Sequence, residues 1–240
     1  MPGFWYFSIA VGLLLHIVVI RGILRNGSHR VYPFLFAFCL ADFLSSVLES
    51  SAFLGVVSWK SIAGELYATY YWGNEFALQL LIFVLMLSMI HRAMEGLPHR
   101  WLLILSIAFA VTSVSILSVP LTYSSSSSFT RWMTDLSGKL SFFSALLNVV
   151  LWSALLRNRN RSRQLLVIAA GLGLLTAGKS IGHHLRGWTP QAVPYADAFI
   201  VLSQLLCLLV WCWAFYRVRD PLIPNIMRGA SQSSAVAGRR

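Results

Sequence analysis

Seven long apolar runs divide the chain, and they constrain its fold more than any other feature of the sequence. Each run is 17–24 residues long, and about 20 apolar residues are enough to cross a bilayer as an α-helix. A segment surrounded by lipid satisfies its own backbone N–H and C=O groups only in a helix. We therefore expect an all-α bundle of seven transmembrane helices. The runs are Phe4–Ile20, Val31–Leu54, Tyr67–Ile90, Trp101–Val119, Leu140–Leu156, Gln164–His184 and Asp197–Tyr216.

The composition excludes a water-soluble fold. Only 11% of the residues are charged and 57% are apolar, whereas a soluble domain carries about 25% charged residues. The loops between the runs are short, which leaves no room for a soluble catalytic or signalling domain. We expect one transmembrane domain over residues 1–218, with the lipid bilayer as its main partner. A disordered polar tail is expected over 219–240, where Pro221 and Pro224 block helix continuation.

Lysine and arginine residues indicate the orientation of the bundle. The net charge is +11, but the basic residues lie between apolar runs, so they indicate membrane orientation and no nucleic-acid partner. Fourteen of them fall in alternate loops and the C-terminal tail, and five fall on the other side. Because basic loops stay in the cytoplasm, we expect the N-terminus outside and the C-terminus inside a cell membrane, such as the bacterial inner membrane. A cytoplasmic protein partner would dock on the basic inner loops.

Four ionisable residues lie deep within the runs, where each costs about 2.5–3.5 kcal/mol at the bilayer centre. They are Asp42 and Glu49 in the second run, Glu75 in the third and Lys179 in the sixth. Counted along the helices at about 1.5 Å per residue, Glu49, Glu75 and Lys179 share one level in the outer half of the membrane. Asp42 is deeper, close to the midplane, and has no aqueous surface within reach.

Helical spacing places these residues on polar faces. Asp42 and Glu49 are seven residues apart, and therefore lie two turns apart on one side of their helix. Glu75 and Lys179 each have a polar neighbour one turn away. We expect a polar cluster among the second, third and sixth spans, with Glu75 and Glu49 as counter-ions of Lys179. The candidate ligand-binding residues are Lys179, Glu75, Glu49, Asp42, Asn74, Gln79 and His183.

Such a cluster would form an outward-facing pocket that binds a small polar or anionic molecule, or an ion, at Lys179. Transport would use Asp42 as a relay carboxylate between the pocket and the cytoplasm, whereas sensing would need a partner protein. In a second interpretation, the pair of Glu75 and Lys179 only sets the helix register in a scaffold subunit that binds no ligand. In a third interpretation, Glu49 and His183 are hydrated residues at the outer rim.

Enzyme and cofactor chemistry are not expected. An intramembrane enzyme would need a nucleophile or a metal beside a converging base, and the sequence contains no such constellation. The cysteines Cys39, Cys207 and Cys212 all lie inside apolar runs, without disulfide or metal-ligand spacing. His16 is expected about one turn from the inner end of the first run, and a haem held by His16 and His91 is the least favoured alternative. We predict no catalytic residue, no metal and no cofactor.

Two motifs resemble those of a group of uncharacterised bacterial seven-helix membrane proteins. They are Pro33–Phe38, which opens the second run, and Tyr70–Glu75, which opens the third. The resemblance implies the seven-helix layout and no activity. It also implies that Tyr71, Trp72 and Glu75 act together, with the aromatic pair at the membrane interface. Retinal proteins and zinc-dependent seven-helix hydrolases are excluded, because the last run contains neither lysine nor histidine.

A faint internal repeat connects the two ends of the chain. The first three and the last three runs share a layout, and Gln79-Leu80-Leu81 is echoed by Gln204-Leu205-Leu206. Three-plus-one-plus-three sugar transporters and proline-glutamine-loop transporters carry a proline-glutamine dipeptide within their helices. Pro190-Gln191 lies in a predicted loop, so the match to them is poor.

Overall fold

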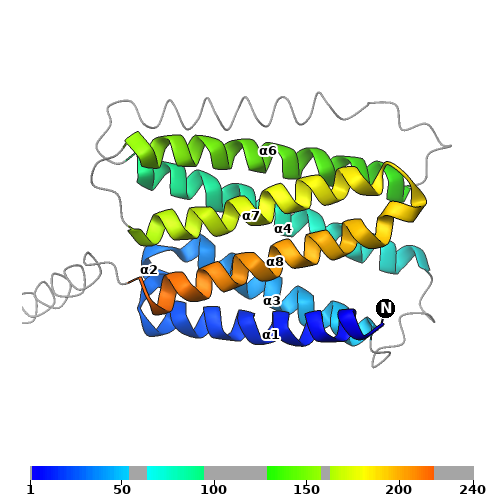
Figure 1. Cartoon of the computed structure of the whole chain (residues 1–240), viewed down its shortest axis with the longest axis horizontal. Helices are drawn as coiled ribbons and strands as arrows, with labels where there is room; N and C mark the ends of the chain where they lie inside the picture. The colour runs from blue at the N-terminus through cyan, green and yellow to red at the C-terminus, as the bar shows by residue number, and fades with distance from the viewer. Residues whose placement is uncertain (1, 54–63, 95–128, 158–162, 219–240) are drawn as a thin grey trace, which may run out of the picture.

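The computed structural model describes residues 2–53, 64–94, 129–157 and 163–218, and its elements are helices (Figure 1). Six of these helices are long and apolar enough to cross a membrane, which indicates a multi-pass helical membrane protein. The predicted span Trp101–Val119 and the predicted tail 219–240 lie outside the described residues. The helices are α1 (Pro2–Arg25), α2 (Ser28–Val31), α3 (Pro33–Phe53), α4 (Gly64–Ala93), α6 (Phe129–Arg157), α7 (Arg163–Arg186), the short 3₁₀ helix η2 (Pro190–Ala192) and α8 (Val193–Tyr216).

Helices α1 and α6 extend well beyond their apolar runs. α1 continues past Ile20 to Arg25, and α6 begins eleven residues earlier than expected. A basic side chain such as Arg21 can follow the helix surface and keep its charge in the headgroup region, so one charge does not end a helix. His16 is consequently nine residues, about 14 Å, from the end of α1. The expectation that His16 lies one turn from this end is wrong.

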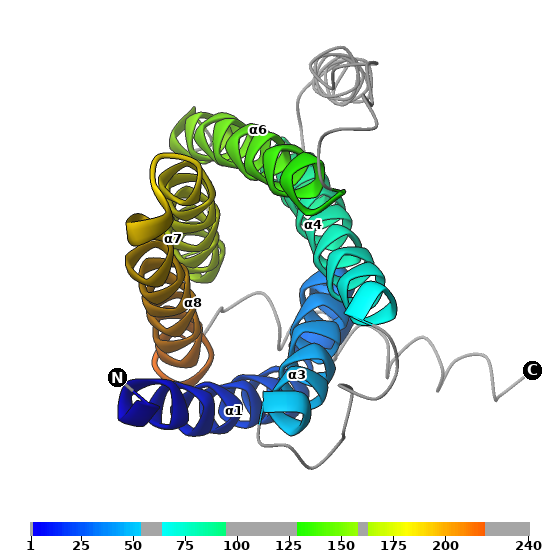
Figure 2. The ribbon, with the colours of Figure 1, turned by 90° about the vertical axis from the view of Figure 1, so that its right-hand side faces the viewer.

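The six long helices form a closed ring, which Figure 2 shows along the helix axes. The order around the ring is α1, α3, α4, α6, α7 and α8, and α8 packs against α1 to close it. Helices α4 and α6 run in the same direction, so the chain leaves α4 at one end of the bundle and enters α6 at the other (Figure 1). The halves α1–α3–α4 and α6–α7–α8 therefore repeat one pattern of helix directions.

The two ends of the bundle differ in charge. Arginines gather at the end where α1 and α8 finish, which we call the basic end (Figure 1). Lys139 and Arg186 lie toward the opposite end, which we call the outer end after the orientation that the sequence predicts. This division follows the lysine and arginine bias of the sequence. The arginines of the basic end are Arg21, Arg25, Arg30, Arg92, Arg163 and Arg217.

A dense apolar core fills the half of the bundle next to the basic end. Leu35, Met89 and Ile168 are at most 1% exposed there. Trp211 joins α7 to α8, since its indole N–H donates a 3.1 Å hydrogen bond to the Ile168 carbonyl oxygen. With its N–H satisfied inside the bundle, this ring fills the core without an unpaired donor. The described helices are thus closely packed at the basic end.

Small residues bring α7 and α8 into close contact around Lys179. A β-carbon at Gly178 would overlap with the Ser203 side chain, and a β-carbon at Gly182 would overlap with Ile200. Lys179 lies between these two contacts and is only 7% exposed. The close approach of the two helices therefore carries the lysine into the interior.

Gly178→Ala should destabilise the protein by about 1–3 kcal/mol, the usual effect of overpacking a tight contact. Gly73→Ala is the matched control, because nothing lies within 4 Å of a β-carbon at Gly73 and alanine favours a helix over glycine. Thermal unfolding of the two purified variants in detergent measures the difference. Equal unfolding midpoints would contradict the close α7–α8 contact.

Candidate functional site

A buried ion pair joins α4 to α7. Lys179 Nζ lies 3.0 Å from Glu75 Oε1 and donates a hydrogen bond to it. The two side chains are only 9% and 15% exposed. Each charge has lost most of its water and is stabilised by the opposite charge of its partner instead. Of the two expected counter-ions of Lys179, the structure pairs it with Glu75, and Glu49 has another partner.

A second buried cluster joins α1, α3 and α8 at mid-depth. His16 Nε2 lies 2.9 Å from Asp42 Oδ2. Gln204 Nε2 donates to both carboxylate oxygens of Asp42, over 3.2 and 3.0 Å. His16 is 1% exposed and Asp42 is 8% exposed. The deepest carboxylate of the sequence thus has two partners, one from each half of the bundle.

Glu49 has a neutral partner. Asn74 Nδ2 donates a 3.1 Å hydrogen bond to Glu49 Oε1, and Asn74 Oδ1 accepts a 2.7 Å hydrogen bond from Ser45. The amide therefore holds the carboxylate in place without neutralising it. Within the described ranges Glu49 takes part in no ion pair.

These clusters line one cavity of about 220 Å³. Tyr71, Arg186 and Asp197 line it toward the outer end, where Arg186 Nε donates a 2.6 Å hydrogen bond to Asp197. Asp42 and Gln204 line it at mid-depth. The cavity therefore reaches from the outer end toward the centre of the bundle, and helices of both halves form its wall.

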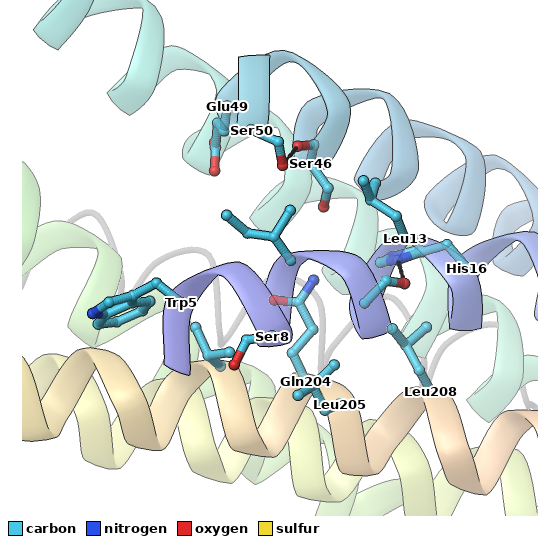
Figure 3. A pocket seen from close by; sticks show the side chains of 13 residues that line it. Trp5, Ser8, Leu13, His16, Ser46, Glu49, Ser50, Gln204, Leu205 and Leu208 are labelled. Atoms are coloured by element: carbon cyan, nitrogen blue, oxygen red, sulfur yellow. Dashed lines mark hydrogen bonds between the residues drawn. The ribbon is translucent and has the colours of Figure 1, made fainter. Parts of the chain in front are cut away.

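A second cavity of about 190 Å³ adjoins the first, between α1, α3 and α8 (Figure 3). Figure 3 shows Glu49 on α3 and Gln204 on α8 on opposite sides of this space. His16 lines the second cavity but not the first. The residues that line both cavities are Trp5, Ser46, Glu49, Val201 and Gln204.

His183 and Gln79 differ in their surroundings. His183 Nε2 lies 3.7 Å from Glu75 Oε1, and neither ring nitrogen has a hydrogen-bond partner among the described residues. Gln79 lies outside the cavity and donates a 3.1 Å hydrogen bond to Ser141 of α6. Asn74 does not line the cavity either, and it contacts the lining residues Glu49 and Ser45. The predicted site residues that line the cavity are Lys179, Glu75, Glu49, Asp42 and His183.

Four further residues belong to the site and are not among the predicted ligand-binding residues. His16 was placed too near a helix end, because the first run was ended at Ile20. Gln204 is an amide within an apolar run, and a polar group at that depth is expensive without a partner, so the sequence did contain a signal. Arg186 lies beyond the predicted end of the sixth run and Asp197 begins the seventh, yet the two side chains pair across the α7–α8 connection.

Trp72 is buried inside the protein, so its ring is not exposed on the surface of the bundle. Its ring packs edge to face against Tyr71, with the ring centroids 5.2 Å apart, but only 4% of Trp72 is exposed. Tyr71 lines the cavity together with Glu75. Tyr71 therefore shares the cavity wall with Glu75, whereas Trp72 is not among the described residues that line the cavity.

Comparisons of the chain with protein-family models, with curated proteins and with solved structures find no match. The resemblance to bacterial seven-helix proteins stays an expectation. Within the described part of the chain, no group of His, Cys, Asp and Glu residues is arranged to hold a metal ion.

Glu75→Gln and Lys179→Met should each destabilise the protein by about 3–5 kcal/mol, because each leaves one buried charge without its partner. The double variant should recover most of this loss, since both charges are then absent. Denaturant unfolding of the four proteins in detergent, followed by circular dichroism, gives the interaction energy. Losses that simply add in the double variant would contradict a direct pair.

The pair of Arg186 and Asp197 provides the control for this cycle. Its side chains are 20% and 31% exposed, so water and salt weaken the attraction. The same double-mutant cycle with Arg186→Gln and Asp197→Asn should give a smaller interaction energy, about 0.2–1 kcal/mol.

Proposed function

We propose that this protein is a membrane transporter whose outward-facing polar cavity binds a small cation. The observation that carries the proposal is the charge of the cavity wall. Three carboxylates have a basic partner, whereas Glu49 has only the amide of Asn74 among the described residues. The cavity therefore offers one uncompensated carboxylate to a positively charged ligand. The three pairs are Asp42 with His16, Glu75 with Lys179, and Asp197 with Arg186.

An anion at Lys179, which the sequence suggested, has less support. It would compete with Glu75, which is 3.0 Å from Lys179, and it would meet Glu49 on the same wall. Like charges repel strongly where the surroundings have a low dielectric constant. A cation would instead be attracted by Glu49 and could bind the hydroxyl oxygens of Ser45 and Ser46, which also line the cavity.

The size of the cavity limits the ligand. A volume of about 220 Å³ holds about seven water molecules at about 30 Å³ each. This room suits a partly hydrated inorganic cation or a small protonated amine. Peptides and nucleotides are too large for it.

Two features of the fold favour transport over a purely structural role. The halves α1–α3–α4 and α6–α7–α8 repeat one pattern of directions, and transporters built from such parallel repeats bind their substrates near the midplane, between the repeats. Here Glu75 and Asp42 of the first half meet Lys179 and Gln204 of the second. The close packing at the basic end fits a state that is open to the outer end only.

The proposal includes a seven-span topology with the N-terminus outside and the C-terminus in the cytoplasm. Its support is the common direction of α4 and α6, which requires one more crossing between them. The apolar run Trp101–Val119 is long enough for that crossing. The arginines of the basic end would then face the cytoplasm, as positive loops usually do.

Small cations should raise the thermal unfolding midpoint of the purified protein, because a ligand that binds only the folded state stabilises it. The probes are the chlorides of sodium, potassium, ammonium and methylammonium, with tetrabutylammonium as a cation too bulky for the cavity. At about one hundred times Kd, the gain is about 2.7 kcal/mol. Glu49→Gln should abolish the shift, and His184→Gln, outside the cavity, should retain it.

A series of sodium salts with different anions separates the two kinds of ligand. A stabilisation that follows the anion, and is lost in Lys179→Met but not in Glu49→Gln, would contradict the cation site. Uptake of the stabilising cation into proteoliposomes then tests transport. Binding without uptake would favour a sensor, and no binding of any probe would favour a scaffold.

Cysteine labelling in intact cells should give opposite results at the two ends of the bundle. In a background with the three native cysteines replaced, a membrane-impermeant maleimide should label Thr189→Cys at the outer end. Arg30→Cys at the basic end should react only after the membrane is permeabilised. Both positions are exposed, so access to the residue does not limit the reaction. Labelling of Arg30→Cys in intact cells would contradict the orientation.

A further inference from the structure

We infer that His16 and Asp42 form a proton-binding site, and that a cation entering the cavity exchanges with its proton. The inference rests on the proposed function, because the cation is the one proposed to bind at Glu49. The exchange forms and breaks no covalent bond between heavy atoms. One proton leaves the dyad of His16 and Asp42 for bulk water, and one positive charge enters the cavity.

The hydrogen bonds of His16 indicate how many protons the dyad holds. His16 Nδ1 lies 2.8 Å from the carbonyl oxygen of Gly12, and a carbonyl oxygen only accepts, so Nδ1 carries a proton. His16 Nε2 lies 2.9 Å from Asp42 Oδ2, and this bond needs a second proton, on the imidazole or on the carboxyl group. With that shared proton the dyad is neutral, and without it the dyad carries one negative charge.

The dyad lies in the wall between the two cavities. His16 lines the cavity between α1, α3 and α8, and Asp42 lines the larger one. Gln204 lines both cavities and donates to Asp42. The two residues that share the proton therefore border different cavities. The other titratable groups that face the dyad are Cys39 and Glu49 from α3, Glu75 from α4, Lys179 from α7, and Cys207 and Cys212 from α8.

Charge couples the dyad to the cation. Glu49 lies two turns from Asp42 on the same face of α3, about 10 Å along the helix, and lines both cavities. A cation at Glu49 favours the negative state of the dyad, and so promotes release of the proton. Linkage is reciprocal, so protonation of the dyad weakens cation binding. The apparent Kd should rise by up to about tenfold for each pH unit below the titration of the dyad.

His184 provides an internal comparison. Its Nδ1 lies 2.7 Å from the carbonyl oxygen of Ser180, the same bond to the preceding turn that His16 makes. It has no ion pair with a carboxylate among the described residues, and it lines neither of the two cavities. His184→Gln therefore removes a histidine of similar local geometry without touching the dyad.

The exchange is tested on the full chain in lipid nanodiscs and weak buffer, with a pH-indicator dye. Addition of sodium, potassium, ammonium or methylammonium chloride should release up to one proton per chain from the wild-type protein and from His184→Gln. His16→Gln should still bind the cation, as seen from its unfolding midpoint, but release no proton. Equal release from His16→Gln, or cation binding without release from the wild type, would overturn the exchange.

The shared proton itself is tested without any cation, which separates this inference from the proposed function. Nuclear magnetic resonance of ring-labelled histidine in the wild type should show one imidazolium at neutral pH, or infrared spectra should show one protonated carboxyl group. The signal should disappear in both His16→Gln and Asp42→Asn and persist in His184→Gln. A neutral His16 beside an ionised Asp42 at neutral pH would overturn the proton site, whether or not a cation binds.

Discussion

The burial of charged side chains inside the bundle determines how they are arranged. A charge that loses its water must find a partner or become neutral, because the surroundings have too low a dielectric constant to stabilise it alone. Lys179 and Glu75 meet this requirement across α4 and α7, and Asp42 meets it with His16 across α1 and α3. Each pair thereby fixes the rotation of two helices about their axes. The polar residues at once hold the ring together and line its cavity.

The sequence predicts the existence of the helices well and their ends poorly. Apolar length fixes where a helix crosses lipid, since each backbone must satisfy itself. The ends depend on how far a basic side chain reaches toward the headgroups, and α1 extends past Arg21 for that reason. How far a side chain reaches depends on the depth of its residue in the assembled bundle. The sequence of a single segment does not give that depth.

The pairing of charges is only partly contained in the sequence. Equal depth brings Glu75 and Lys179 to one level, so their contact follows from helical rise once the two helices are neighbours. Equal depth also applied to Glu49, yet Glu49 accepts from Asn74. The difference is set by the rotation and order of the helices around the ring, and these depend on long-range packing such as the close contacts of Gly178 and Gly182 with α8. Sequence reasoning misses His16 as the partner of Asp42 for another reason, because the predicted end of the first run at Ile20 places His16 too near a helix end.

The two halves of the ring use equivalent polar positions differently. Gln79 of α4 and Gln204 of α8 occupy matching places in the repeated layout. Gln79 joins α4 to Ser141 of α6 by a neutral hydrogen bond, whereas Gln204 donates to the carboxylate of Asp42. One half therefore makes a structural contact where the other half supports a charge. This asymmetry concentrates the carboxylates between α3, α4 and α8, and so gives the cavity one chemically distinct wall.

The proposed transport would require the two halves to move without leaving a buried charge unpaired. Separation of α4 from α7 would break the pair of Glu75 and Lys179, and an unpartnered buried charge costs about 3–5 kcal/mol. His183 lies one turn along α7 and already approaches Glu75 to 3.7 Å, while Glu49 lines the same cavity as Lys179. A shift of α7 toward the basic end by about one turn, roughly 5.4 Å, would bring His183 level with Glu75 and would move Lys179 toward the level of Asp42. His183, whose ring nitrogens have no hydrogen-bond partner among the described residues in this state, would then become the partner of Glu75.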